Sequence, residues 1–379
     1  MAIRDERTER TAAAARACRA DWAVLTSPDT VFYSVQHDML IETGPSPFAG
    51  GPTTAFVAAN GSATGLLVNN LEEPAARASS ADHVISYPGL DLLDLSAVER
   101  RFLEAAERAA RELEVGGTVA VQEATFPASL HAVLEERGAR FVSIDHELDV
   151  ARSTKTPVEI DSLRWCAHLA SVGQRAALQA ARPGRSELEI WADVRLAMER
   201  LEGGRMPMLG DMASGIDRTA AISGWPTSRI VEEGDPILCD LAPRARGYWG
   251  DSCNAIFVGE PSPEFMRLYE TTRRSVEHIR ETLRPGISAA DFDRSVRAVF
   301  ERDGLANPIH TGHGIGTGVH EWPRIVPGQD VTIQAGMVLM LEPGTYVGGI
   351  GGVRLERMFL VTETGNEILS DFEHLLAPA

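Results

Sequence analysis

Cysteine and lysine are scarce in this sequence. Its four cysteines lie far apart and form no CxxC pair: Cys18, Cys166, Cys239 and Cys253. This spacing argues against a disulfide framework and is typical of a protein of the reducing cytoplasm, where we expect this one to act. Lys155 is the only lysine among the 36 basic residues, a bias that we attribute to a GC-rich genome rather than to function.

Long apolar runs are also missing. No segment has the roughly 18–20 consecutive apolar residues that cross a bilayer, and the charged residues 1–10 lack the apolar core of a signal peptide. The net charge of −18 argues against a nucleic-acid partner, because phosphate binding requires concentrated Lys and Arg. The 379 residues, 44% of them apolar, are enough for two or three globular domains.

The N-terminal part alternates between short apolar strands and helices. We predict strands at 22–25, 54–57 and 118–121, and Leu95–Leu113 has the spacing of an amphipathic helix. This half has no dinucleotide fingerprint, P-loop or nucleophile elbow. We therefore predict an α/β scaffold or lid domain over residues 1–152. The polar stretch that follows predicts a boundary to a second domain over 153–379.

The second half repeats itself after 102 residues. Arg182-Pro183-Gly184 corresponds to Arg284-Pro285-Gly286, and the apolar run 234–240 corresponds to 336–342, each run ending in a carboxylate. Helices are predicted in two matching pairs: 158–181 with one that begins at Ser186, and 262–284 with one that begins at Ser288. The sequence thus predicts an α+β protein whose second half is a duplicated helix–helix–hairpin unit. We expect the two copies to pack about a pseudo-twofold axis, with equivalent strand ends meeting at the centre.

Two pairs of acids flank the turns of the predicted hairpins. Asp240 and Asp251 flank the first turn, and Glu342 and Glu356 flank the second, which is the glycine-rich run 348–352. Residues equally far from the centre of an antiparallel hairpin face each other, with Cβ atoms about 5 Å apart. Like charges so placed repel, and each pair therefore predicts a cation between its members.

His313 is the expected fifth ligand, because its flanking glycines let the backbone come close and leave the imidazole unobstructed. Two divalent ions would cancel the charge of the four carboxylates. Oxygen-rich ligation favours Mn²⁺, with Co²⁺, Fe²⁺ or Zn²⁺ as alternatives. Two ions about 3.5–4 Å apart lower the pKa of a bridging water and supply a hydroxide nucleophile. Glu342 would then shuttle the proton to the leaving nitrogen.

Four short motifs follow one another in this half: Gly312-His313-Gly314-Ile315-Gly316, His320-Glu321-Trp322-Pro323, Glu342-Pro343-Gly344 with Tyr346, and Val353-Arg354-Leu355-Glu356. In combination they resemble the prolidase, aminopeptidase P and creatinase group of metallopeptidases, the M24 or pita-bread family. The resemblance covers about Arg152 to the C-terminus, and the N-terminal domain fits the creatinase-like layout of the group. All five family ligand positions are filled: Asp240, Asp251, His313, Glu342 and Glu356.

The resemblance also implies roles for neighbouring residues. It makes His320 a catalytic residue that contacts the substrate near the scissile bond, and it places Arg354 against a substrate carboxylate. It also makes Tyr346 a substrate-binding residue. Family members are commonly homodimers, and we expect a homodimer here.

Three positions depart from the family pattern. Ser223 stands where the family carries a histidine, and Cys253-Asn254 replaces a Thr-Arg pair. A hydroxyl can donate a hydrogen bond, but it cannot carry a positive charge or shuttle protons near pH 7. Ser223 is therefore a candidate substrate-binding residue in an altered pocket.

The leading hypothesis is hydrolysis of an amide-type C–N bond in a small substrate, with Xaa-Pro dipeptides as the family default. One alternative is an ectoine- or creatine-type small molecule as substrate. Another is a metal-dependent lyase, in which a carboxylate abstracts a proton and no water is added. A third is a binding module without catalysis, against which the complete ligand set argues.

Overall fold

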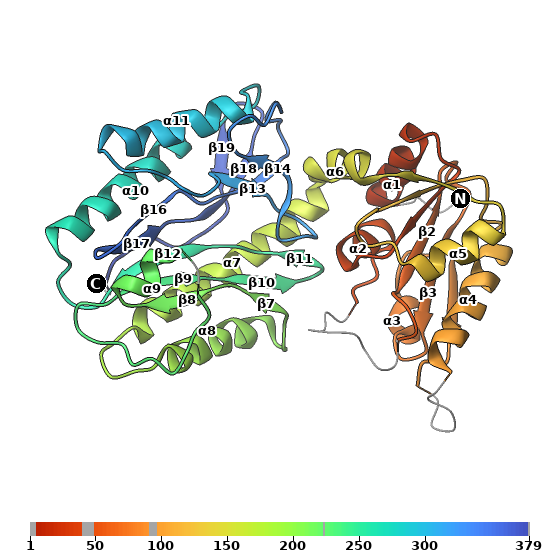
Figure 1. Ribbon diagram of the computed structural model, residues 1–379, viewed down its shortest axis with the longest axis horizontal. Coiled ribbons are helices and arrows are strands. Elements are labelled where there is room, and N and C mark those ends of the chain that lie inside the picture. Colours follow the sequence, from red (N-terminus) through yellow and green to blue (C-terminus); the bar gives the residue numbers. More distant parts are fainter. Residues whose placement is uncertain (1–4, 40–48, 91–96, 223, 378–379) are drawn as a thin grey trace. The chain divides into compact units, whose positions relative to one another are not determined.

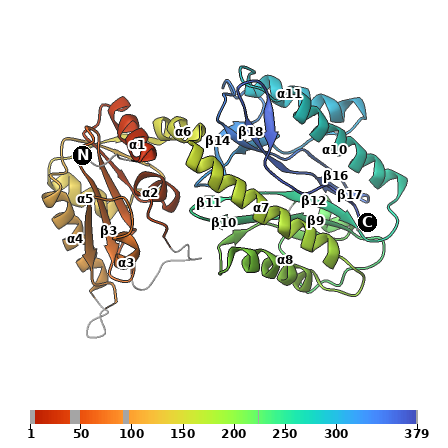
Figure 2. The ribbon, with the colours of Figure 1, turned by 180° about the vertical axis from the view of Figure 1, so that it is seen from behind.

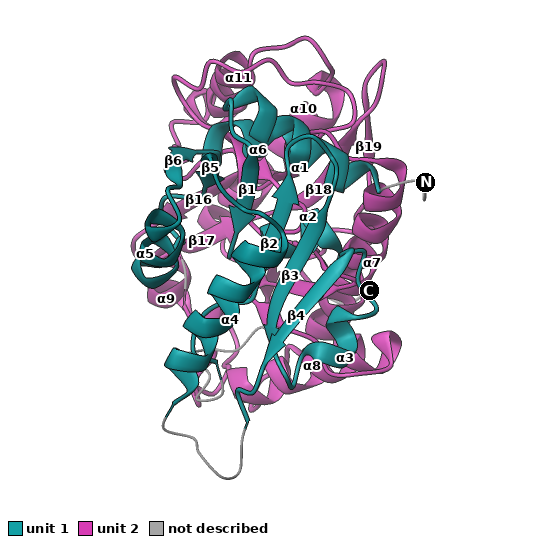
Figure 3. Cartoon of the chain, turned by 90° about the vertical axis from the view of Figure 1, so that its right-hand side faces the viewer, with its two compact units in different colours: residues 1–152 teal, residues 153–379 magenta. Residues whose placement is uncertain are grey.

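The computed structural model describes residues 5–39, 49–90, 97–222 and 224–377. The chain divides into two compact units, Met1–Arg152 and Ser153–Ala379, which are coloured along the sequence in Figures 1 and 2 and by unit in Figure 3. Among the described residues, no helix combines the length and the apolar character that a membrane span requires.

Unit 1 is built around one mixed sheet with the strand order β4-β3-β2-β1-β5-β6. Its strands are β1 (Trp22–Leu25), β2 (Thr54–Ala58), β3 (Thr64–Asn69), β4 (His83–Tyr87), β5 (Thr118–Val121) and β6 (Arg140–Ser143). The central strand β1 pairs antiparallel with β2 and parallel with β5. The three strands predicted in this unit are confirmed, and two of them, β1 and β2, are buried at every residue.

Helices cover both faces of this sheet. They are α1 (Glu6–Ala17), α2 (Pro28–Val35), α3 (Glu73–Ala76), α4 (Val98–Glu112), α5 (Ala128–Glu136) and α6 (Asp145–Ser153). Phe102 of α4 and Leu130 of α5 pack with Trp22 and Val24 of β1. Residues of α1, α2 and α6 pack with the alternate β1 residues on the other face. The helix predicted at Leu95–Leu113 is confirmed as α4, although its first two predicted residues lie outside the described ranges.

Unit 2 contains the two predicted helix pairs. Its helices are α7 (Pro157–Ala180), α8 (Glu187–Glu202), α9 (Ile216–Ala220), α10 (Pro263–Thr282) and α11 (Ala289–Arg302). The predicted capping box at the start of α8 is confirmed, since Ser186 and Glu189 each bond to the other's backbone N–H. Figures 1 and 2 show the strands of this unit between α7 and α8 on one side and α10 and α11 on the other.

Those strands form several small antiparallel sheets. They are β7 (Met208–Leu209), β8 (Met212–Ser214), β9 (Pro236–Asp240), β10 (Ala242–Ala245), β11 (Tyr248–Trp249), β12 (Cys253–Phe257), β13 (Gly312–Gly314), β14 (Glu321–Ile325), β15 (Val338–Leu341), β16 (Gly344–Val347), β17 (Gly351–Arg354), β18 (Arg357–Val361) and β19 (Asn366–Ile368). The sheet orders are β12-β9-β8, β11-β10-β7, β14-β13-β15-β18-β19 and β16-β17.

The duplication predicted from the sequence extends to individual backbone pairs. Ser186 forms an isolated β-bridge with Ile230, and Ser288 forms the equivalent bridge with Thr332. Each bridge ties the start of the second helix of a copy to the segment that leads into the strand β9 or β15. The two copies thus place β9 and β15 in equivalent positions inside unit 2. β9 ends with a carboxylate residue, and β15 is followed by one.

Candidate metal centre

The five predicted ligands all lie at strand ends or in a short strand of unit 2. Asp240 ends β9, Asp251 precedes β12, His313 is the middle residue of β13, Glu342 follows β15, and Glu356 lies between β17 and β18. All five side chains are largely shielded from solvent, and the most exposed of them, that of Asp240, is only 18% exposed. The structure therefore gathers the five residues inside one unit.

The first hairpin has a register that differs from the predicted one. Asp240 lies opposite Cys253 rather than Asp251. The chain reverses at Arg246-Gly247, whose φ angles of 54° and 79° are those of a two-residue type I′ turn. The prediction was wrong because it placed the turn one residue too early. Each residue of β9 therefore pairs with a residue two positions later in the chain than the predicted partner. A shift of two leaves each side chain on the same face of the ribbon.

The second hairpin has the predicted register. Gly344 pairs with Arg354 in β16 and β17, and Leu341 pairs with Arg357 in β15 and β18. Between these pairs, Glu342 and Glu356 lie opposite each other, as a hairpin centred on the glycine run 348–352 predicts. The turn accommodates this register because it is rich in glycine, the residue for which positive φ costs least.

The donor atoms gather in two groups, within each of which they lie no more than 4.8 Å apart: His310, His313 and Glu342, and Asp240, Cys253 and Glu356. Asp251 lies beside the first group, with its Oδ2 atom 3.8 Å from Nε2 of His313. Donors bound at about 2.0–2.3 Å to one cation lie up to roughly 4.5 Å apart. The spacing of both groups therefore fits a metal ion.

His313 is oriented for ligation by its own backbone. Its Nδ1 atom lies 2.9 Å from the carbonyl oxygen of Gly314, which can only accept, so Nδ1 carries the proton and Nε2 keeps its lone pair. Nε2 lies 3.2 Å from Oε1 of Glu342. The flanking glycines permit this packing, because a Cβ atom on Gly312 would lie 2.1 Å from the carbonyl oxygen of Met340 on β15.

Burial and mutual repulsion raise the pKa values of three acids. Burial raises the pKa of Asp240 to about 6, against the opposing charge of Arg354. Burial and the charge of Asp240 raise the pKa of Asp251 and that of Glu356 well above the usual range. Glu342 differs: burial acts in the same direction, but the hydrogen bond from His310 and the nearby imidazole of His313 hold its pKa below the usual range.

Metal uptake is therefore expected to release protons. An acid with a raised pKa holds its proton to higher pH in the metal-free protein, and a bound cation must displace it. Calorimetric titration with Mn²⁺ near pH 6, in buffers of different ionisation enthalpy, should show net proton release. The apparent affinity should fall as the pH is lowered from 7 to 5, by about tenfold per pH unit for each displaced proton. An affinity that is constant over this interval would contradict the raised pKa values.

Arg354 and Tyr346, the predicted substrate contacts, lie against the acids. Arg354 forms an ion pair with Asp240, and its Nε atom lies 2.7 Å from Oε1 of Glu356. The hydroxyl oxygen of Tyr346 is 3.4 Å from a guanidinium nitrogen of Arg354. The guanidinium thus offsets part of the buried negative charge, and substrate contact by either residue stays a prediction.

Three imidazoles cluster at the other end of the site. The ring of His320 lies 4.3 Å from that of His313 and 6.3 Å from that of His310, measured between centroids. Desolvation and the neighbouring His313 lower the pKa of His320 to about 4, so the ring is neutral near pH 7. The Nε2 atom of His310 lies 2.7 Å from Oε1 of Glu342.

Two members of the donor groups, His310 and Cys253, were missed as candidate ligands from the sequence. His310 lies two residues before β13 and outside the strand, so the alternation that places strand side chains gives no information about it. Cys253 was missed because the predicted register put Asp251 opposite Asp240. The turn signal Arg246-Gly247, with glycine at the second central position, could have given the correct pairing.

Ser223 lies outside the described residues, but the segments on either side of it share one anchor. Glu187 is fully buried, and its carboxylate accepts hydrogen bonds from the backbone N–H of Ser214 at 2.7 Å and from that of Thr227 at 2.8 Å. Both hydroxyls donate to it as well. A single buried carboxylate therefore fixes the two ends of the stretch in which the family histidine is replaced.

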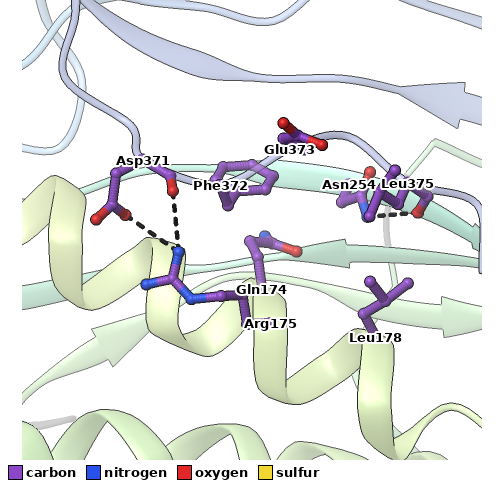
Figure 4. Close-up of a pocket in the computed structure, with 8 residues that line it drawn as sticks. All are labelled: Gln174, Arg175, Leu178, Asn254, Asp371, Phe372, Glu373 and Leu375. Atoms are coloured by element: carbon purple, nitrogen blue, oxygen red, sulfur yellow. Dashed lines mark hydrogen bonds and ion pairs between the residues drawn. The ribbon is translucent and has the colours of Figure 1, made fainter. Parts of the chain in front are cut away.

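A cavity of about 260 Å³ lies elsewhere in unit 2 (Figure 4). Residues of α7, β12 and the C-terminal segment line it: Gln174, Arg175, Leu178, Asn254, Asp371, Phe372, Glu373 and Leu375. Because consecutive strand residues point to opposite faces, Asn254 points away from the side of β12 that carries Cys253. The cavity contains none of the predicted site residues.

The family described as Metallopeptidase family M24 matches residues 161–363, and the Creatinase/Prolidase N-terminal domain matches residues 7–154. The chain is 28% identical over 354 residues to the Xaa-Pro dipeptidase of Pyrococcus furiosus, covering 92% of this chain and 95% of that protein.

Solved structures agree with this likeness. The prolidase from Pyrococcus furiosus has a TM-score of 0.79 at 26% identity and covers 96% of this chain and 99% of its own. The prolidase from Pyrococcus horikoshii has a TM-score of 0.82 at 24% identity, covering 98% of this chain and 100% of its own, and indicates the fold alone.

Proposed function

Because the chain belongs to metallopeptidase family M24 and is a metallohydrolase, we propose that it uses two divalent metal ions to hydrolyse the C–N bond of a small substrate. An Xaa-Pro dipeptide is the first candidate, which the names of its relatives support. The observation that carries the proposal is the convergence of four buried carboxylates and the Nε2 atom of His313.

The donor set fits such ions. Five residues would hold them: Asp240, Asp251, His313, Glu342 and Glu356. Four carboxylates and an imidazole with a free lone pair suit Mn²⁺, with Co²⁺, Fe²⁺ or Zn²⁺ as alternatives. When bound, a pair of such ions would supply a hydroxide nucleophile near neutral pH and polarise the carbonyl group under attack.

The remaining steps fall to side chains of this chain. His310 and His313, which lie against Glu342, keep its carboxylate ionised at pH 7, so it can accept a proton and pass it to the leaving nitrogen. His320 is neutral at that pH and can donate a hydrogen bond from its N–H to the substrate. Arg354 and Tyr346 would position the substrate from the side of Asp240.

The proposal is tested by metal analysis of the purified protein, followed by assays of dipeptides and small amides with the metal found. Products are analysed after reaction in ¹⁸O-labelled water. We expect one labelled oxygen in the new carboxyl group. A product that forms without label would instead show a metal-dependent lyase, and a protein that takes up no divalent metal would exclude both reactions.

Substitution of Ser223 by histidine is expected to raise Xaa-Pro cleavage, because the imidazole restores a group that can carry or transfer a proton near pH 7. General acid–base groups contribute about 10²–10⁴-fold, and we expect a gain in kcat/KM towards the lower end of that range. The matched control is Ser223→Gln, which offers an amide but no titratable group. Equal rates for the two variants and the parent would show that this position does not limit the reaction.

A further inference from the structure

Cys253 introduces a sulfur atom among the metal-binding carboxylates. It begins β12 directly opposite Asp240, so the two side chains share one face of the ribbon. The backbone N–H of Glu356 donates to the carbonyl oxygen of Cys253 at 3.0 Å, which ties the segment bearing this glutamate to the same strand. Three different parts of the chain therefore bring one thiol and two carboxylates together.

The distances suit a common cation. Sγ of Cys253 and one oxygen each of Asp240 and Glu356 lie within 4.8 Å of one another. A tetrahedral Zn²⁺ ion with a sulfur bond of about 2.3 Å and oxygen bonds of about 2.0–2.2 Å places its donors roughly 3.4–3.6 Å apart. Small side-chain adjustments close the difference.

Both carboxylates keep an oxygen for this ligation. Arg354 contacts Oδ2 of Asp240 and Oε1 of Glu356, and each carboxylate keeps a second oxygen with its own lone pairs. Cys253 itself is fully buried, and its thiol makes a long contact of 3.9 Å with the carbonyl oxygen of Asn254. The sulfur is therefore shielded from solvent and close to the acids.

We propose that Cys253 is a sulfur ligand of the metal ion held by Asp240 and Glu356, and that it makes this centre prefer Zn²⁺ or Co²⁺ to Mn²⁺. On binding, the thiol releases its proton to solvent and the sulfur donates a lone pair to the ion. Thiolate is a soft ligand that favours zinc, whereas purely carboxylate and water ligation suits manganese. This inference rests on the proposed function, because it requires a metal ion in that group.

The test is spectroscopic and uses the full-length protein. The metal-free enzyme is loaded with Co²⁺, and its absorption is recorded beside that of Cys253→Ser and of Cys239→Ala, a control in which the neighbouring buried thiol of β9 is removed. We expect a near-ultraviolet sulfur-to-cobalt charge-transfer band in the parent and in the Cys239 variant, and its loss in Cys253→Ser. X-ray absorption of the zinc-loaded parent should show a sulfur shell at about 2.3 Å.

Competition between metals gives a second readout. Cys253→Ser should shift the preference between Zn²⁺ and Mn²⁺ towards Mn²⁺ by about 10- to 100-fold, the scale of losing one interaction that supports a bound metal. Normal metal uptake with oxygen and nitrogen shells alone would overturn the role of Cys253 and leave the proposed function standing. Absence of metal uptake by the parent would instead overturn the proposed function.

Discussion

Asp251→Ala is expected to abolish metal binding and activity together while the metal-free protein stays folded. Asp251 is buried beside His313, and burial together with the charge of Asp240 raises its pKa. The ionised carboxylate of Asp251 therefore destabilises the folded protein unless a cation lies beside it. Removing the carboxylate relieves its repulsion with Asp240. We expect kcat/KM to fall on the order of 10³-fold or more, the scale of losing one preorganised charge at a reaction centre.

The measurements are metal content, kcat/KM and thermal unfolding with and without added metal. The variant should unfold at the same temperature as the metal-free parent or slightly above it, and the stabilisation that the parent gains from metal should disappear. Asp235→Asn is the matched control: this buried carboxylate pairs with Arg229 and contacts none of the proposed ligands, and its loss should lower stability without removing metal. Unchanged metal content in Asp251→Ala would remove this residue from the centre.

The two hairpins show how far register can be predicted from the sequence. The second could be centred correctly because its turn is a symmetrical glycine run, and glycine tolerates the turn at no other cost than entropy. The first was centred one residue too early, because its turn places Arg246 at positive φ, which is uncommon for arginine and weakens the turn signal that Gly247 gives. Asp240 and Asp251 were still placed on the correct face, since an error of two residues preserves alternation.

Contacts between distant segments could not be predicted from the sequence. Neither the proximity of His310 to Glu342 nor that of Cys253 to Glu356 follows from spacing along the chain, because each depends on how β13, β15 and β12 pack. The helices and buried strands were predictable because their signals are local: capping residues and apolar periodicity. The structure also gives a partner to the single lysine, whose rarity we attributed to genome composition.

Lys155→Met is expected to lower the free energy of unfolding by about 3–5 kcal/mol, the usual cost of leaving one member of a buried ion pair without its partner. The Nζ atom of Lys155 lies 2.7 Å from Oε2 of Glu321, and the two side chains are only 1% and 5% exposed. Glu321 also accepts a hydrogen bond from the backbone N–H of Gly318 at 2.9 Å. The pair therefore stabilises the loop that ends at His320, and the variant should lose activity as well as stability.

Denaturant unfolding of three variants separates the charge effect from general damage. Lys155→Met with Glu321→Leu removes both charges and should recover most of the lost stability, because a buried ion pair replaced by apolar side chains is often neutral. Arg164→Met breaks an exposed pair with Glu367, each side chain being 42% exposed, and should cost less than about 1 kcal/mol. If the double variant is no more stable than Lys155→Met, the charge is not what stabilises the contact between Lys155 and the loop that ends at His320. Packing of the aliphatic part of the lysine side chain would then stabilise it.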